Sequence, residues 1–438
     1  MVTVVLVGSA ATYLALPSGS PTTQELQPTM ASEMSSTNST VTTQSDATIN
    51  QTVSTQAAGT TFRLGNSSAL SAVDGNEARK VFQAFGLTWV FYTDGTNMVY
   101  QTFSNSSSSV PVVVGPETIG WHFSVWYDQP SNTVYYVATN ASNFLVPQTD
   151  QTQGDCQTGY LPGDIISTSN ATTIAATDEC LVSGFSYGWG TPSAGGTIDW
   201  NVTQGFVQTG TFATNPYIYG NGTQVWVSLQ TNSGASLEVW LFDHGSWNRV
   251  DEISTALGST NEILPLQSGI ALIYAVGGLH ITPRFSEMSI TITTDDGASW
   301  SGPVSTVTNS AWQNALSVGN TIYIVGIDNA TQVIFWSYTM GASAFTPARV
   351  LASDYIWPFL STDGNSSLVI TYIDNNSVYI RTSTNLGATW SPQTLVATSP
   401  AGVVPPAVIP FYFASSTVPV CWVTGVGPYQ LQCSVAGA

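Results

Sequence analysis

The sequence predicts an all-β protein, and three observations support that fold class. Val, Ile, Thr and aromatic residues, which favour strands, are frequent, while charged residues make up only 8% of the chain. Short hairpin patterns recur along most of its length. The corresponding valines of two successive hairpins, Val333 and Val378, lie 45 positions apart, which is the length of one four-stranded blade. We therefore expect a β-propeller of four-stranded antiparallel blades.

The recurring unit is an apolar strand, a turn containing Asp or Asn, and a second strand in which Val precedes another apolar or aromatic residue. Alternating strands on both sides of a turn residue that tolerates positive φ are typical of a β-hairpin. The expected hairpins cover residues 89–100, 124–135, 226–240, 322–335 and 369–380.

The composition divides the chain into three regions. Residues 1–17 contain an apolar stretch of about fifteen residues, whereas a membrane-spanning helix needs roughly twenty. We interpret this region as the remnant of a signal peptide, with a short membrane anchor as the alternative. Residues 18–60 are rich in Ser, Thr, Gln and Asn, which predicts a disordered stalk. The propeller is expected over 61–438, and a membrane contact only through the first region, if it is retained.

The charge of the chain excludes several function classes. Seven basic residues against 26 acidic ones give a formal net charge of -19, which repels nucleic acid. Glycine-rich phosphate loops, nucleophile elbows and zinc-protease helices are missing from the sequence. The three histidines, His122, His244 and His280, lack the spacing of metal ligands. We therefore expect no nucleic-acid partner, no cofactor and no metal.

The cysteines and the glycosylation sequons favour the cell exterior. The four cysteines form two local pairs, Cys156 with Cys180 and Cys421 with Cys433, and an even count favours disulfides. The second pair flanks a Gly-Val-Gly-Pro turn, so its members face each other across a hairpin. A zinc site is the alternative, but Cys-x-x-Cys pairs are missing. Eleven Asn-x-Ser/Thr sequons occur along the chain.

Two segments, 293–300 and 383–390, share a further pattern and begin 90 residues apart, which is two blade lengths. They read Thr-Thr-Asp-Asp-Gly-Ala-Ser-Trp and Ser-Thr-Asn-Leu-Gly-Ala-Thr-Trp. Both resemble the Asp box, Ser/Thr-x-Asp-x-Gly-x-Thr-Trp, of the sialidase-like β-propeller family, which is also called the BNR repeat. Decayed copies occur at 337–345 and 243–247.

The resemblance implies that the boxes are structural turns on the outer rim. The Asp accepts backbone hydrogen bonds, the Gly adopts a backbone conformation that other residues avoid, and the Trp packs into the blade. Asp295 and Asp296 are therefore not expected to act as a catalytic pair. The implied structural residues are Thr293, Asp295, Gly297, Trp300, Ser383, Asn385, Gly387 and Trp390.

The repeats predict seven blades, with six as the alternative because sialidases of the family have six. The last blade shows only three strands, and Thr61–Ser68 is expected to supply the fourth and close the ring. The second repeat carries an insertion at about 143–196. The expected blades cover 79–117, 120–208, 215–256, 265–307, 311–352, 355–398 and 402–438.

The resemblance also defines what an active sialidase would need. The family uses three arginines to hold the substrate carboxylate, a Tyr nucleophile paired with Glu, and an Asp as acid/base. Of the six arginines, Arg249, Arg349 and Arg381 lie close to boxes, at positions expected on the rim. The remaining candidate site residues are Arg63, Arg79, Arg284 and Glu287. A surface ion pair is the favoured interpretation of the last two.

We expect a secreted or cell-surface propeller that recognises a glycan or a surface protein without catalysis. The loops of all blades surround one opening, and the many Trp and Tyr side chains suit stacking on sugar rings. Two alternatives remain open. One is an exo-sialidase or related glycoside hydrolase, and the other is a structural subunit of a cell-surface layer or filament.

Overall fold

The computed structural model is divided into two units, Met1–Asn50, which lies outside the described residues, and Gln51–Ala438. The predicted signal peptide or anchor (1–17) and the stalk (18–60) lie outside the described residues. No described helix has the length and hydropathy needed to span a membrane. The structure describes residues 61–69, 72–73, 79–104, 107–116, 122–139, 145–147, 179–181, 184–209, 213–231, 236–253, 257–276, 286–306, 309–329, 331–374, 376–414, 416–425 and 427–437.

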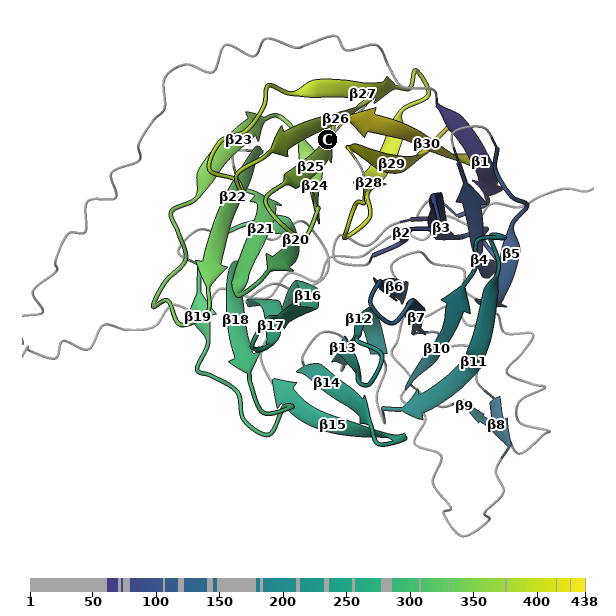
Figure 1. The fold of residues 1–438 in the computed structure, drawn as a ribbon, viewed down its shortest axis with the longest axis vertical. Helices are drawn as coiled ribbons and strands as arrows, with labels where there is room; N and C mark the ends of the chain where they lie inside the picture. The colour runs from purple at the N-terminus through teal and green to yellow at the C-terminus, as the bar shows by residue number, and fades with distance from the viewer. Residues whose placement is uncertain are drawn as a thin grey trace, which may run out of the picture. The chain divides into compact units, whose positions relative to one another are not determined.

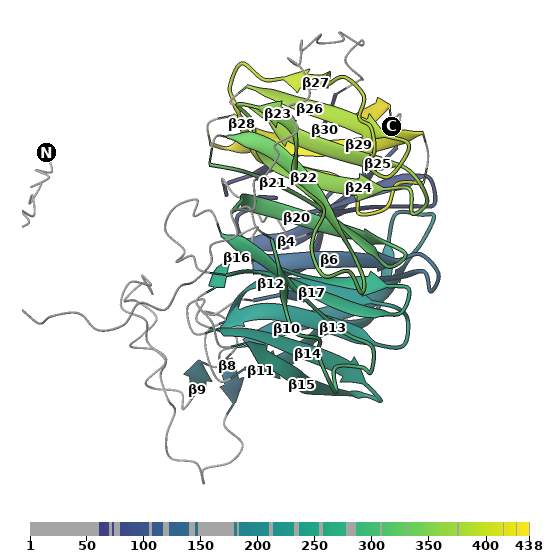
Figure 2. The ribbon, with the colours of Figure 1, turned by 90° about the vertical axis from the view of Figure 1, so that its left-hand side faces the viewer.

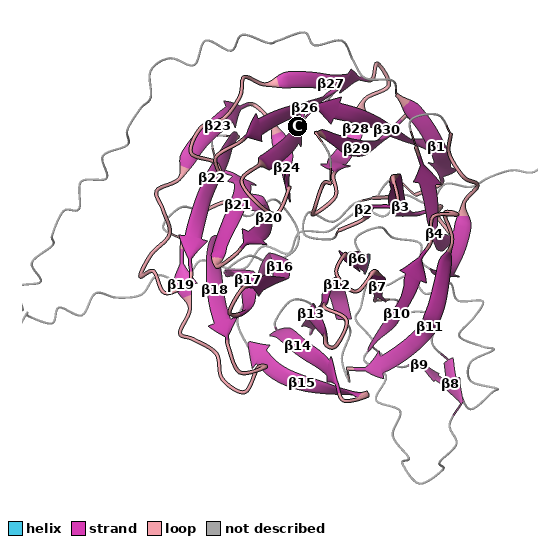
Figure 3. Ribbon diagram, viewed as in Figure 1, coloured by secondary structure: helices cyan, strands magenta, loops and turns pink. Residues whose placement is uncertain are grey.

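The second unit is a ring of seven four-stranded antiparallel blades, which confirms the predicted fold class (Figure 1). Its described residues form strands, turns and loops (Figure 3). The first four blades, written from the axis to the rim, are β2 (Val81–Ala84), β3 (Leu87–Thr93), β4 (Asn97–Phe103) and β5 (Val112–Pro116); β6 (Phe123–Asp128), β7 (Thr133–Ala138), β10 (Gly184–Pro192) and β11 (Ile198–Gln208); β12 (Ala213–Gly220), β13 (Val225–Thr231), β14 (Ser236–Asp243) and β15 (Ser246–Ile253); and β16 (Leu257–Leu266), β17 (Gly269–Val276), β18 (Glu287–Thr293) and β19 (Val304–Ser305).

The remaining three blades complete the ring. They are β20 (Ala311–Val318), β21 (Thr321–Ile327), β22 (Gln332–Thr339) and β23 (Arg349–Ser353); β24 (Ile356–Thr362), β25 (Leu368–Ile373), β26 (Ser377–Ser383) and β27 (Thr394–Thr398); and β28 (Val403–Val408), β29 (Thr417–Thr424), β30 (Tyr429–Gly437) and β1 (Phe62–Ser67).

The hydrophobic core lies between neighbouring blades. Middle strands are covered by a blade on each side, so both of their faces are buried, and all seven residues of β13 are buried. The rim strand β15 has the opposite character and no buried residue. Trp89, Trp226 and Trp422 are among the largest fully buried side chains, each on the second strand of its blade.

The first described strand closes the ring. β1 pairs with β30 in antiparallel register, with Phe62 opposite Cys433, and so becomes the rim strand of the last blade, as predicted. On the other side of β30, Cys433 faces Cys421 of β29, and the two form a buried disulfide with Cα atoms 4.0 Å apart. The other expected pair cannot be followed, because Cys156 lies outside the described residues.

The predicted insertion in the second repeat ends earlier than expected. Residues 184–192, placed within the insertion by the sequence pattern, are the third strand of blade 2, β10. This strand reads Gly-Phe-Ser-Tyr-Gly-Trp-Gly-Thr-Pro, and its three glycines interrupt the alternation that marks strands elsewhere. Before this strand, β8 (Leu145–Pro147) and β9 (Glu179–Leu181) form a separate two-stranded sheet.

The topology gives the ring two distinct faces, seen edge-on in Figure 2. Each of the seven blades starts at the axis, and its strands alternate in direction, so all inner strands run the same way. The turns that follow the inner strands therefore lie on one face, which we call the turn face. The connections between blades lie on the opposite face.

Candidate functional site

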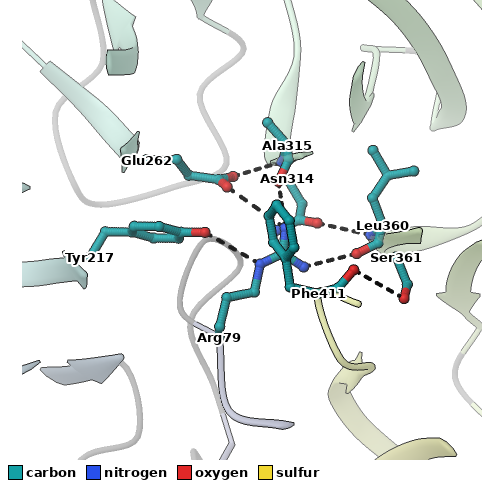
Figure 4. Close-up of polar contacts among 8 residues, drawn as sticks. All are labelled: Arg79, Tyr217, Glu262, Asn314, Ala315, Leu360, Ser361 and Phe411. Atoms are coloured by element: carbon teal, nitrogen blue, oxygen red, sulfur yellow. Dashed lines mark hydrogen bonds and ion pairs between the residues drawn. The ribbon is translucent and has the colours of Figure 1, made fainter. Parts of the chain in front are cut away.

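One predicted site residue, Arg79, lies at the axis of the ring (Figure 4). It precedes β2, and its side chain is only 1% exposed. Its Nε donates to the hydroxyl of Tyr217 at 3.4 Å, Nη1 donates to the carbonyl of Leu360 at 2.8 Å, and Nη2 donates to the carbonyl of Ala315. Nη2 also lies 3.9 Å from the carboxylate of Glu262. Arg79 thus connects the inner strands of blades 3, 4, 5 and 6.

Neighbouring inner strands are also joined directly around this guanidinium. Glu262 accepts the backbone N–H of Ala315 at 2.8 Å, and Asn314 accepts that of Leu360 at 2.8 Å. The Phe411 ring lies 4.8 Å from the guanidinium carbon. Because all three guanidinium nitrogens donate within the hub, Arg79 is a structural connector and is not available to grip a ligand carboxylate.

Backbone bulges aim these side chains at the axis. The pairing of β12, β20 and β24 with the next strand shifts register immediately before Tyr217, Asn314 and Phe359. A bulge places an extra residue in one strand and redirects the side chains that follow. At these bulges Trp312 and Trp357 adopt positive φ, and their rings stack with centroids 4.9 Å apart. The hub is therefore built by a repeated irregularity of the inner strands.

On the turn face, a cavity of about 880 Å³ opens around the axis. It is lined by the ends of β6, β12 and β16, by the β24–β25 turn and by the β28–β29 connection. A small adjoining pocket of about 30 Å³ shares its aromatic wall and reaches down to Arg79. The connector network therefore underlies one side of the cavity.

Aromatic rings form the wall of the cavity. Trp126 lies at the centre of the group, with its ring centroid 5.1 Å from that of Tyr219 and 6.2 Å from that of Tyr412. The segment carrying Tyr412 is held to β24, since Thr362 N–H donates to Phe411 and Phe413 N–H donates to Thr362. These contacts, 3.0 and 2.9 Å long, position the backbone on both sides of Tyr412.

Tyr219 and Tyr412 are partly exposed on this wall, whereas Trp126 is buried. The indole N–H of Trp126 is enclosed and has no hydrogen-bond partner among the described residues. The hydroxyl of Tyr412 also has no described partner. Burial, followed by the nearby charge of Asp128, raises the pKa values of Tyr219 and Tyr412 to about 12. Both hydroxyls are therefore protonated at neutral pH and can donate hydrogen bonds.

Two carboxylates complete the cavity, Asp128 and Asp363. Asp128 accepts the backbone N–H of Ser131 at 3.2 Å. Asp363 accepts three backbone N–H groups of its own turn, at 2.8 to 3.0 Å. Desolvation raises the pKa of Asp363, but these hydrogen bonds together lower it below the usual value. Neither carboxylate forms an ion pair with a described residue, and no Arg, Lys, His or Glu is among the described lining residues.

The other predicted catalytic candidates do not gather with Arg79. Arg63 lies on the rim strand β1, exposed, and donates to Asn66 at 2.6 Å. Glu287 is exposed at the start of β18, and Arg284 lies outside the described residues. Arg249 and Arg349 lie on the rim strands β15 and β23. The described residues therefore bring one arginine to the axis, and each of its three guanidinium nitrogens already donates a hydrogen bond within the hub.

The two box-like segments form matching turns between the third and the rim strand of their blades. Thr293 and Ser383 each accept the N–H of the glycine four positions later, at 2.9 and 2.8 Å. Asp295 and Asn385 each accept the N–H four positions later, at 2.9 and 2.8 Å. The glycines, at φ +84 and +83, adopt the left-handed conformation that favours glycine.

The tryptophans of these turns pack between blades. Trp300 meets Trp226 of the preceding blade edge-on, with ring centroids 6.4 Å apart, and Trp390 meets Phe335 at 5.3 Å. One box is nearer to the axis than the resemblance implies, because Ser383 also lines the edge of the cavity. The cavity spreads from the axis along blade 6, so it reaches the end of β26.

Sequence analysis did not identify the residues that line the cavity. Trp126 and Asp128 were within a predicted hairpin, and their spacing of two places them on one face of β6. That signal does not distinguish a cavity wall from a blade core. Tyr412 lies in a connection without a repeat pattern, where nothing in the sequence marks its position at the axis.

Comparison with known proteins shows the fold alone. A polysaccharide lyase of family PL25, an ulvan lyase, has a similar structure with a TM-score of 0.54 at 9% identity, covering 86% of this chain and 95% of that one. The NanB sialidase of Streptococcus pneumoniae has a TM-score of 0.40 at 10% identity, covering 87% and 71%. The six-bladed fungal lectin from Aleuria aurantia has a TM-score of 0.43 at 11% identity, covering 77% and 98%. Searches of protein-family models and of curated proteins found no match.

Proposed function

We propose that this protein is an extracellular, non-catalytic propeller that binds a glycan in the cavity on its turn face. The observation that carries the proposal is the wall formed by Trp126, Tyr219 and Tyr412 around the axis. Aromatic rings with a polar edge suit sugars, which present both apolar C–H faces and hydroxyl groups. The volume of about 880 Å³ falls within the range typical of small-molecule sites.

The polar groups of the cavity suit sugar hydroxyls. The Tyr412 hydroxyl offers a donor, while Asp128 and Asp363 offer acceptors. Charged acceptors form the stronger kind of hydrogen bond with hydroxyl groups. The cavity can therefore hold a sugar by stacking and by hydrogen bonds together.

The chemistry of the cavity favours binding over hydrolysis. A glycoside hydrolase needs a carboxylic acid that stays protonated, and environments that raise the pKa supply it. Asp363 has the opposite setting, because backbone N–H groups lower its pKa. The sialidase alternative additionally needs free arginines, and the one described arginine at the axis donates all its nitrogens to the hub.

Two further observations support the proposal. The similar polysaccharide lyase has also been solved bound to -[GlcA(1-4)Rha3S]-, so a propeller of related shape accommodates a saccharide in that protein. The buried Cys421–Cys433 disulfide is compatible with the oxidising exterior of the cell. Fold similarity at 8% identity does not transfer the lyase chemistry to this chain.

The test is calorimetric titration of the protein with a panel of oligosaccharides. Tyr412→Ala removes one wall of the cavity, and we expect it to weaken binding at least tenfold, or about 1.4 kcal/mol. Tyr429→Ala removes a tyrosine outside the cavity and should bind as the wild type does. Equal binding by both variants, or release of new reducing ends during the titration, would contradict a non-catalytic site on the turn face.

A further inference from the structure

We propose that the cavity selects a glycan that carries a protonated amine, such as an oligomer of glucosamine with free amino groups, over its N-acetylated counterpart. This inference rests on the proposed function, because it concerns the same cavity. It depends on the charges of the lining residues and on what their burial by a ligand would require.

Among the described residues, the cavity has negative charge and no cation that balances it. Asp128 and Asp363 both line it, and neither forms an ion pair with any described residue. Arg79 lines the small adjoining pocket, but its charge faces Glu262 and the backbone carbonyls of the hub. The cavity is therefore acidic, while the charge of Arg79 in the hub beneath it is balanced by Glu262.

A bound ligand would displace water from these carboxylates. Removing a charged group from water is unfavourable unless a counter-charge or hydrogen bonds replace the lost hydration. Asp363 already receives three backbone N–H groups, whereas Asp128 receives only one, from Ser131. A neutral sugar supplies hydroxyl donors but no charge. An ammonium group on the sugar supplies both, so it offsets the cost at Asp128 more completely.

The aromatic wall stabilises the same cation. Trp126 lies two residues before Asp128 on β6, so the two side chains project from one face of the strand. Tyr219 and Tyr412 flank Trp126 with ring centroids 5.1 and 6.2 Å away. After burial, the nearby charge of Asp128 raises the pKa values of both tyrosines. Ring faces attract cations, so an amine beside Asp128 gains a second favourable interaction.

The overall negative charge of the chain also favours a cationic ligand. A formal net charge of -19 concentrates cations near the surface and repels anionic sugars. The expected ligand therefore differs in charge from sialic acid and from uronate-containing chains. Among otherwise similar oligomers, binding should follow the order amine, then N-acetyl, then carboxylate.

The experiment is calorimetric titration of the whole protein with a glucosamine tetramer and with an N-acetylglucosamine tetramer. At about pH 5 the amines are protonated and ordinary aspartates are ionised. We expect the amine tetramer to bind roughly tenfold more tightly, a difference of about 1.4 kcal/mol. Added salt should reduce this preference while leaving the binding of the N-acetyl tetramer nearly unchanged.

Asp128→Asn keeps the shape of the side chain and removes its charge. We expect it to abolish the preference for the amine while the N-acetyl tetramer still binds. Asp296→Asn is the matched control, because Asp296 is exposed on a rim turn and the same charge is lost there. The preference should survive in this control.

The outcomes separate the two proposals. Binding of both tetramers with equal affinity, or an amine preference that persists in Asp128→Asn or at high salt, overturns the inference and leaves glycan binding intact. Binding of neither tetramer nor of any other oligosaccharide overturns the proposed function itself. The salt series uses the wild-type protein, so it decides the matter even if the Asp128 variant fails to fold.

Discussion

The guanidinium of Arg79 touches four inner strands, and this position makes one side chain important to the whole ring. Arg79 is the only arginine that the described residues place at the axis. Burial of a cation is tolerated here because carbonyls, a phenol and a carboxylate surround it. A candidate site residue is thus a structural element of the hub.

Replacing Arg79 with Leu should destabilise the protein by about 3–5 kcal/mol, because Glu262 loses its buried cation and two carbonyls lose their donor. Urea unfolding measures the loss. Arg63→Leu is the control, since Arg63 is exposed on the rim, and its cost should stay below about 0.5 kcal/mol. Similar costs for the two variants would show that the hub does not depend on the guanidinium.

The cavity tyrosines should make the protein sensitive to alkali. Native Tyr219 and Tyr412 keep their protons to about pH 12, whereas unfolded tyrosine ionises near 10. Between these values the native state binds more protons, so the free energy of unfolding falls as pH rises, by up to about 1.4 kcal/mol per pH unit for each tyrosine. This stabilisation is complete below pH 10.

Ultraviolet titration of tyrosinate in the native protein tests this prediction. Tyr412→Phe should remove one phenol from the group that ionises late. If both cavity tyrosines titrate near 10 in the folded protein, the assignment of a buried, acidic wall is wrong.

At the scale of elements, the turns and bulges determine local structure that the strand pattern alone does not. In the Thr293 and Ser383 turns the third residue accepts the same backbone N–H, although it is Asp in one turn and Asn in the other. Both residues act as acceptors for the closing N–H, so charge is not essential to the turn.

Asn385→Ala should therefore lower the free energy of unfolding by about 1 kcal/mol, because the N–H of Thr389 loses its acceptor. Asn385→Asp should cost much less, since the other turn functions with Asp295 in that place. Thermal melting compares the two variants. A larger loss for the Asp variant would mean that the donor of Asn385 to Thr389, rather than its acceptor, stabilises the turn.

The repeat pattern predicted the elements well and the cavity poorly, for physical reasons. Hairpins depend on local alternation and turn residues, so the sequence revealed blades, their order and ring closure. The cavity depends on which side chains meet across blades. Tyr412 lies 286 positions from Trp126, and no local pattern relates them. Glycine-rich β10 shows the converse case, in which a regular strand lacks its usual pattern.

At the scale of the molecule, stability depends on closing the ring. β1 covers the outer edge of β30, and the disulfide joins β30 to β29 within the same blade. The closing blade therefore ties the start of the propeller to its end, and its open edge would otherwise offer unpaired backbone groups to other chains.

Removing residues up to Ser68 should expose the edge of β30 and lower the thermal midpoint, with self-association as a consequence. A chain that begins at Thr61 is the matched control and should stay intact. Calorimetry and size-exclusion chromatography report the two effects. A variant without β1 that melts like the control would show that the closing strand contributes little to the ring.

The central claim is that the aromatic, acidic cavity on the turn face holds a sugar. The most direct measurement is a crystal structure of the protein with the bound glucosamine tetramer. The account predicts a sugar ring against Trp126, Tyr219 and Tyr412, with its amine beside Asp128. A tetramer bound on the opposite face or on the rim, with the cavity occupied only by water, would contradict it.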